Sequence, residues 1–260
     1  MFYFLIGLIV GSFLNVCIYR LPREGSLVFP PSHCPNCQHR LGIWELIPVV
    51  SYLFLRGRCA HCRSPISVRY PLVELITGLL FLAIAVSFPL STYPLEFCFY
   101  LIFVCLLIVA FFIDLEHQVI PDIVSLPGIL LGLVYHGWQG LVYRQAVFSA
   151  LGSAVIGLLL GYAILFIIGL LGKLWYKKTV MGEGDLYLAG FIGAFLGWQG
   201  VVLAIFLAYL LAAVVALAFL ALGRVKLGEY IPFGPALVAG GLTALFFGNI
   251  IINWYLTMFI

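Results

Sequence analysis

Charged side chains are scarce in this sequence. Asp, Glu, Lys and Arg together make up 9% of the 260 residues, whereas hydrophobic residues make up 64%. Because a soluble domain carries about 25% charged residues, this composition excludes an ordinary soluble domain. The net charge of +3 does not indicate nucleic-acid binding either. The mean hydropathy of +1.18 instead favours a chain that crosses a membrane several times.

Two families of catalytic motif are also absent. The sequence contains no His-Glu-x-x-His, and its five histidines are too scattered to form a membrane metalloprotease site. No Gly-x-Ser-x-Gly with a suitable histidine partner occurs, which argues against a serine protease. Inverted repeats typical of transporters are not evident. Chemistry in this chain must therefore depend on other residue types.

Long apolar runs predict the helices. A run of about 18 or more apolar residues can cross a bilayer. Six segments reach or approach that length, namely 1–18, 71–88, 94–113, 147–172, 201–222 and 235–260. Two shorter runs, 123–138 and 186–198, are weaker candidates. The sequence therefore predicts an all-α polytopic membrane protein with about eight transmembrane helices.

The basic residues predict the orientation of these helices. No Lys or Arg precedes the first run and Arg20 and Arg23 follow it, so we expect a retained helix with a periplasmic N-terminus. With eight helices, all of the 13 Lys and Arg residues except Arg144 lie in the cytoplasm. A six-helix arrangement would move the lysines of segment 173–178 outside, so the charge distribution favours eight.

Residues 20–71 form a polar insert that contains two Cys-x-x-Cys pairs. Cys34 and Cys37 make up the first pair, and Cys59 and Cys62 the second. Four thiolates suit a tetrahedral zinc ion and leave no open position for water, so the metal would be structural. Two disulfides or four unused thiols are the alternatives, although the cytoplasm disfavours disulfides.

Two of the few acidic residues in the spanning part are candidates for catalysis. Asp114 ends one apolar run, and Asp185 follows Gly182 and Gly184 at the start of another. Two carboxylates at one site can share a proton, so that one activates water and the other protonates a leaving nitrogen. The glycines would let a substrate backbone approach closely. Alternatively, both aspartates merely cap helix ends.

The two short runs also predict the depth of these aspartates. Helices of about 13 to 16 residues are roughly 20 to 24 Å long, shorter than the ~30 Å hydrocarbon layer. We therefore expect the aspartates to line a recessed, partly dry cavity. Glu116, Glu183 and Glu229 either attract a basic peptide or are solvated loop residues, and Glu96 is expected to be solvated.

Several motifs, taken in order, resemble those of the type IV prepilin peptidases, also called leader peptidase/N-methyltransferases. They comprise residues 11–16, 19–22, 34–37, 46–48, 51–53, 59–62, 69–74, 114–122, 182–185 and 232–235. The resemblance implies a Gly-x-Gly-Asp aspartyl protease of the bacterial inner membrane. Such an enzyme cleaves prepilins and type II secretion pseudopilins after a glycine at the cytoplasmic face.

The resemblance also implies roles for individual residues. The catalytic aspartates of that family correspond to Asp114 and Asp185, while Asp122, Gly182 and Gly184 have supporting roles. S-adenosylmethionine would donate a methyl group to the new N-terminus, at a site that the sequence does not reveal. The implied domains are the first transmembrane helix (1–19), the zinc-binding insert (20–71) and the peptidase domain (72–260).

Two other functions are open on the sequence alone. The chain is alternatively a zinc-stabilised membrane transporter or channel in which Asp114 and Asp185 bind ions. It is otherwise a non-enzymatic assembly scaffold. Only the peptidase interpretation predicts that an amide at either aspartate stops the cleavage of a prepilin. The oligomeric state has no signature in the sequence.

Overall fold

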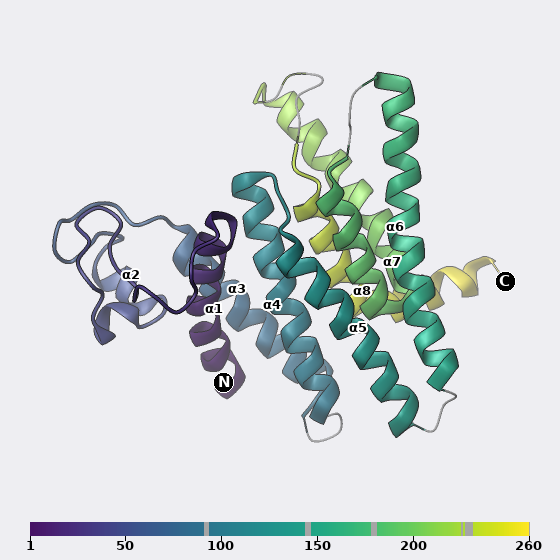
Figure 1. The fold of residues 1–260 in the computed structure, drawn as a ribbon, viewed down its shortest axis with the longest axis horizontal. Helices are drawn as coiled ribbons and strands as arrows, with labels where there is room; N and C mark the ends of the chain where they lie inside the picture. The colour runs from purple at the N-terminus through teal and green to yellow at the C-terminus, as the bar shows by residue number, and fades with distance from the viewer. Residues whose placement is uncertain (91–93, 144–146, 178–180, 225, 227–230, 260) are drawn as a thin grey trace. The chain divides into compact units, whose positions relative to one another are not determined.

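The computed structural model describes residues 1–90, 94–143, 147–177, 181–224, 226 and 231–259 (Figure 1). These residues form helices and no strand. The helices are α1 (Phe2–Arg20), α2 (Val50–Phe54), α3 (Arg69–Ser87), α4 (Pro94–His117), α5 (Asp122–Val142), α6 (Val147–Tyr176), α7 (Glu183–Ala221) and α8 (Gly234–Phe259). Two short 3-10 helices, η1 (Leu21–Arg23) and η2 (Ile43–Leu46), lie in the polar insert. The all-α prediction is confirmed.

The long helix α7 is two helices that fold back on each other at Gly197. This residue has a φ of 73° and a ψ of −179°, which separates residues 183–196 from residues 198–221. A Cβ atom built on Gly161 of α6 would lie 2.4 Å from the Ala189 carbonyl oxygen and 2.9 Å from Val201 Cγ2. In a straight helix these two residues would be ~18 Å apart. The two parts of α7 therefore run antiparallel.

This reversal brings the helix count close to the predicted eight. Within the described ranges, six helices are long and apolar enough to cross a membrane, namely α1, α3, α4, α6, α7 and α8. The two parts of α7 correspond to the predicted runs 186–198 and 201–222, and α5 completes the set. α5 extends to Val142, beyond the predicted end at residue 138. Two polar residues in its second half pair with each other, since Gln139 Nε2 donates to Tyr135 Oη at 2.8 Å.

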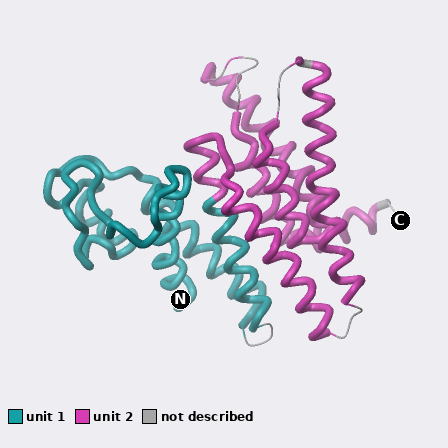
Figure 2. The backbone as a smooth tube through the Cα atoms, in the orientation of Figure 1, with its two compact units in different colours: residues 1–109 teal, residues 110–260 magenta. Residues whose placement is uncertain are grey.

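The chain forms two compact units, residues 1–109 and 110–260 (Figure 2). In the first unit α1 packs closely on α3, because a Cβ on Gly11 would lie only 2.7 Å from Glu74 Cα. The boundary between the units falls within α4 and differs from the predicted domain boundary at residue 71. The units reflect packing, so the functional division into residues 20–71 and 72–260 stays a prediction.

In the second unit, glycines allow α5, α6 and α8 to pack against residues 183–196 of α7. Gly157 of α6 faces Gly193, because a Cβ atom added to Gly157 would lie 2.2 Å from the carbonyl oxygen of Gly193. Gly132 of α5 approaches the backbone of Ala194 in the same way. Small residues let helices approach closely within a membrane. This packing brings the starts of α5, α7 and α8 to the same end of the unit.

Candidate active site

Asp114 and Asp185 come together in the second unit. Asp114 lies in the last turn of α4, which continues to His117, and Asp185 lies in the first turn of α7. Both side chains are buried, with exposed fractions of 3% and 4%. Their carboxylates are close enough to interact electrostatically. Burial removes these groups from water, so their charges influence each other strongly.

No cationic partner of either carboxylate lies among the residues that the structure describes. Among the described residues, no ion pair joins Asp114 or Asp185 to a Lys, Arg or His side chain. A neighbouring cation would favour two ionised carboxylates, whereas two like charges without one repel each other. The site is therefore suited to hold a single proton between two carboxylates.

The first turn of α7 orients Asp185. Gly182 is the N-cap residue, and its backbone N–H donates to Asp185 Oδ2 at 3.2 Å. Asp185 is thus the third residue of the helix, where its side chain accepts a hydrogen bond from the N-cap residue, and it is not itself the N-cap. A Cβ on Gly184 would lie 2.9 Å from both Cβ and the carbonyl oxygen of Ile120. Gly184 therefore accommodates a loop of the chain itself, which corrects the expectation that this glycine leaves room for substrate.

The start of α8 contacts the other carboxylate. A Cβ on Gly234 would lie 2.5 Å from Asp114 Oδ2, and the Gly234 backbone N–H interacts with the same carboxylate. Asp114 Oδ2 is buried, and no described residue forms a hydrogen bond with it. The sequence interpretation missed Gly234 because glycine carries no functional group. Its inclusion in the family motif at 232–235 was the available signal.

A tyrosine in the second part of α7 was missed as well. The phenol of Tyr209 interacts electrostatically with Asp185. Its ring lies 4.8 Å from the ring of Phe233, which immediately precedes Gly234. A single tyrosine within the apolar run 201–222 is ordinary for a membrane helix, so no pattern in the sequence distinguishes it.

The other acidic residues lie outside this pair. Asp122 is the first residue of α5 and is exposed. Glu116 and Glu183 are also exposed, whereas Glu229 lies outside the described residues. Glu96 is buried with an exposed fraction of 8%, so the expectation that it is solvated was wrong.

Parts of α6 and α7 extend beyond the level of the aspartates. Residues 183–196 of α7 form a short helix, as predicted for that run, whereas α5 has 21 residues and is not short. The depth of the aspartates in a bilayer stays a prediction. Gly161 and Gly169 of α6 face residues Ala189 and Met181, so Asp185 is level with about residue 165 of α6. From there α6 continues for roughly 16 Å, and residues 210–221 of α7 continue for roughly 18 Å. Both extensions are visible at the top of Figure 1.

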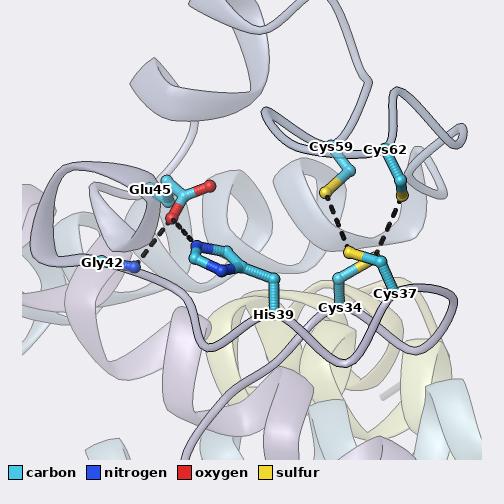
Figure 3. Close-up of polar contacts among 7 residues, drawn as sticks. All are labelled: Cys34, Cys37, His39, Gly42, Glu45, Cys59 and Cys62. Atoms are coloured by element: carbon cyan, nitrogen blue, oxygen red, sulfur yellow. Dashed lines mark hydrogen bonds and ion pairs between the residues drawn. The ribbon is translucent and has the colours of Figure 1, made fainter.

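The four cysteines of the insert form a compact cluster (Figure 3). Cys34 Sγ lies 3.8 Å from Cys62 Sγ, and Cys37 Sγ lies 4.0 Å from Cys59 Sγ. All four sulfur atoms lie within 4.8 Å of one another, and none forms a disulfide. Tetrahedral zinc with 2.3 Å bonds requires sulfur–sulfur distances of about 3.8 Å. The cluster therefore fits a zinc-sized cation.

The two cysteine pairs lie in equivalent turns. Gln38 N–H donates to the Cys34 carbonyl oxygen at 2.9 Å, and Arg63 N–H donates to the Cys59 carbonyl oxygen at 3.0 Å. Gln38 and Arg63 adopt left-handed φ values of 58° and 57°. Each turn presents both of its thiols on one side, so two copies provide four converging ligands.

Histidine lies beside the cluster without belonging to it. His39 stacks on His61 with ring centroids 3.6 Å apart, and His39 Nε2 lies 3.9 Å from Glu45 Oε2. The same carboxylate oxygen accepts a bond from Gly42 N–H at 2.8 Å (Figure 3). The ligand set that the structure brings together consists of the four sulfur atoms.

The thiols do not ionise equally. The Ser64 hydroxyl, with the Ser64 N–H, lowers the pKa of Cys62 to about 6. Although the His39 N–H opposes the effect, burial and the neighbouring thiols raise the pKa of Cys37 to about 11. Four thiolates this close need a positive charge among them. A divalent cation would provide it.

Comparison with known proteins identifies relatives over nearly the whole chain. Residues 5–88 match the bacterial peptidase A24 N-terminal domain, and residues 101–217 match the type IV leader peptidase family. A prepilin leader peptidase/N-methyltransferase of Aeromonas hydrophila is 38% identical over 99% of this chain and 93% of that protein. Proteins of the same name from Neisseria gonorrhoeae and Pseudomonas aeruginosa are each 38% identical over 97% of this chain, covering 93% and 91% of their own lengths. No solved structure matches the chain.

Proposed function

Because this chain belongs to the type IV leader peptidase family, we propose that it cleaves the leaders of prepilins and pseudopilins with Asp114 and Asp185. The observation that carries the residue assignment is the burial of both carboxylates in electrostatic contact, with no cation beside them among the described residues. The protein is a multi-pass membrane enzyme, and the scissile bond follows a glycine of the leader.

The proposed reaction uses one ionised and one protonated carboxyl group. The ionised carboxylate takes a proton from water while the water oxygen bonds to the scissile carbonyl carbon, and the C=O electron pair moves onto the oxygen. The C–N bond then breaks as the protonated carboxyl transfers its proton to the nitrogen. The products are a new carboxyl group on the leader and a new amine on the pilin, and the pair returns to one shared proton.

The neighbouring residues would hold the two groups in place. The Gly182 N–H fixes the orientation of Asp185. Gly184 lets the loop at Ile120 pack against the first turn of α7. Asp122 remains a predicted supporting residue, since it is exposed and lies two residues after Ile120. Rigid placement of this kind favours catalysis, because the reacting groups need no reorganisation.

The recessed site suits a substrate that lies in the bilayer. A prepilin has an apolar N-terminal helix and a basic leader, so its scissile bond lies where the helix begins. In the proposed orientation the N-terminus is periplasmic and the site opens to the cytoplasm, as the distribution of basic residues predicts. Because α6 and residues 210–221 of α7 extend past the level of Asp185, the carboxylates would lie below the membrane surface.

The cysteine cluster is the proposed site of a structural zinc ion. Cys34, Cys37, Cys59 and Cys62 would hold it and stabilise the insert. The family name also implies N-methylation of the new pilin N-terminus, with S-adenosylmethionine supplying the methyl group. The described residues contain no glycine-rich loop after a strand that would indicate its position.

Replacing either aspartate by asparagine tests the peptidase assignment. Asp114→Asn and Asp185→Asn preserve size but remove the shared proton, so we expect cleavage of a purified prepilin in detergent to fall by more than about 10³-fold. Thermal stability should change little, because no cation loses its partner. Glu24→Gln, a change at an exposed carboxylate of the insert, is the control and should retain activity. Normal processing by both aspartate variants would refute the assignment.

Methylation is measured in the same assay with a labelled methyl donor. An aspartate variant should fail to methylate an uncut prepilin, because no free N-terminus forms. It should still methylate a pilin that is supplied already cut. Loss of label on the cut pilin as well would mean that the aspartates act in both reactions.

A further inference from the structure

The reversal of α7 brings Tyr209 level with Asp185. Asp185 lies 12 residues before Gly197 and Tyr209 lies 12 residues after it, and the two parts of α7 run antiparallel. The phenol consequently interacts electrostatically with the Asp185 carboxylate. Its ring also packs on Phe233 at 4.8 Å, next to Gly234, which contacts Asp114. Tyr209 thus interacts with Asp185 and packs on the residue next to Gly234, the glycine that contacts Asp114.

The hydroxyl of Tyr209 is buried and has no hydrogen-bond partner among the described residues. Native proteins pair more than about 90% of their buried polar groups, so each exception requires an explanation. Among the described residues of the second unit, the unpaired buried side-chain atoms are Asp114 Oδ2, His117 Nε2, Ser125 Oγ and Tyr209 Oη. His117 follows Asp114 by one helical turn, and Ser125 lies in the first turn of α5.

These unpaired atoms lie on elements that meet at the aspartates. In the part of the second unit that the structure describes, the unpaired side-chain hydrogen-bonding groups thus lie on α4, α5 and α7, close in sequence or in space to the proposed site. A substrate backbone supplies carbonyl oxygens and N–H groups that match it. Of these four atoms, Tyr209 Oη belongs to the side chain that interacts electrostatically with Asp185, and its hydroxyl can donate a hydrogen bond.

We propose that Tyr209 is a further catalytic residue whose hydroxyl donates a hydrogen bond to the carbonyl oxygen of the scissile peptide bond. This inference rests on the proposed peptidase function. As water attacks the carbonyl carbon, the C=O electron pair moves onto the oxygen and its negative charge grows. The Tyr209 O–H then forms a stronger bond to that oxygen and keeps its own proton throughout. The interaction is strongest in the transition state, so it lowers the barrier.

Tyr209→Phe removes only the hydroxyl and tests this role. Loss of one oxyanion donor reduces kcat by about 10²- to 10³-fold, so we expect a reduction of this size for prepilin cleavage in detergent. KM should change by less than about threefold, since the bond forms mainly in the transition state. The melting temperature should stay the same or rise, because the hydroxyl has no partner to lose.

Tyr135→Phe is the matched control and should show the opposite pattern. Tyr135 is buried in α5, accepts a bond from Gln139 Nε2 at 2.8 Å and stacks on Phe195. Phe195 lies ten residues from Asp185 along one helix, or ~15 Å. Tyr135→Phe should therefore lower the melting temperature and leave kcat within about twofold of the wild type.

Each other outcome would overturn the inference. A Tyr209→Phe variant with kcat within about twofold of the wild type has lost no transition-state contact. A raised KM with unchanged kcat would indicate ground-state binding instead. A lower melting temperature would mean that the hydroxyl has a partner within the protein. If the aspartate variants also cleaved normally, the proposed function itself would fail, and that result is distinct from an unaffected Tyr209→Phe variant alone.

Discussion

Replacing Gly234 with alanine tests whether the start of α8 positions Asp114. A Cβ at residue 234 would lie 2.5 Å from Asp114 Oδ2 and 3.0 Å from its Cγ, whereas ordinary contacts begin at 3.4 Å. The carboxylate would therefore have to move by roughly 0.9 Å, or the start of α8 would have to shift by a similar amount. The same Cβ would lie 3.0 Å from Ile120 Cδ1, which restricts the space available.

Such a displacement should impair catalysis more than it impairs folding. Misplacement of a reacting group by about 1 Å can reduce the rate by about 10²-fold, which corresponds to about 2.7 kcal/mol in activation free energy. Overpacking a buried site costs about 1–3 kcal/mol of stability. The nearest atom here ends a side chain and can turn aside, so we expect a stability loss near the lower limit.

The assay is kcat for prepilin cleavage at saturating substrate, with the melting temperature measured on the same preparation. Gly248→Ala is the matched control on α8, because its Cβ would meet only Leu203 Cδ2 at 3.7 Å. We expect a kcat reduction of about 10²-fold for Gly234→Ala and an unchanged kcat for Gly248→Ala. A Gly234→Ala variant with wild-type kcat would show that α8 does not position Asp114.

Two further substitutions test the first unit. Cys59→Ser should reduce bound zinc from one ion per chain to near zero and make the insert more sensitive to trypsin. The control Cys98→Ser, at an exposed cysteine of α4, should change neither the zinc content nor the sensitivity to trypsin. Metal analysis of Cys59→Ser that still finds one zinc ion per chain would contradict the four-thiolate site. Glu74→Ala removes the acceptor of the Val49 N–H at 2.7 Å, so we expect a loss of about 1–3 kcal/mol in stability and faster hydrogen exchange at Val49. Glu74→Gln retains an acceptor oxygen and should exchange slowly, and equal exchange in both variants would refute the bond.

Hydropathy predicted most helices because a spanning helix must be apolar over its whole length. The run 94–113 is the core of α4, for example. Hydropathy underestimated the length of α5, because an average over residues does not show which polar side chains have hydrogen-bond partners within the protein. His136 lowers that average, yet its Nε2 lies 3.2 Å from the Phe195 carbonyl oxygen and is accommodated within the unit.

The reversal within α7 could be predicted only as a break between two apolar runs. Neither proline nor a polar loop marks it, and the turn depends on the left-handed φ of one glycine, Gly197. Glycine is permitted in that conformation but does not require it. The direction of the second part of α7 follows from packing against α6, which residue types do not specify.

The carboxylates and the thiols were accessible from sequence because charged and metal-binding residues are rare in this chain. The residues that support the carboxylates could not be predicted from the sequence. Gly234 acts through the side chain that it lacks, and Tyr209 through a hydroxyl whose importance depends on its distance from Asp185. Both lie far from Asp114 in sequence, so only the fold reveals the relation.

The described residues place no cation beside the aspartates, so close helix packing has to hold these carboxylates in position. A soluble enzyme can hold a carboxylate with an arginine, but a cation here would favour ionisation of both groups and remove the proton that the leaving nitrogen requires. Position must then come from backbone N–H groups and steric contact. Gly182 N–H provides the first and Gly234 the second. Both depend on helices brought within backbone distance by glycines such as Gly157 and Gly193, so substitutions there should affect cleavage without touching a carboxylate.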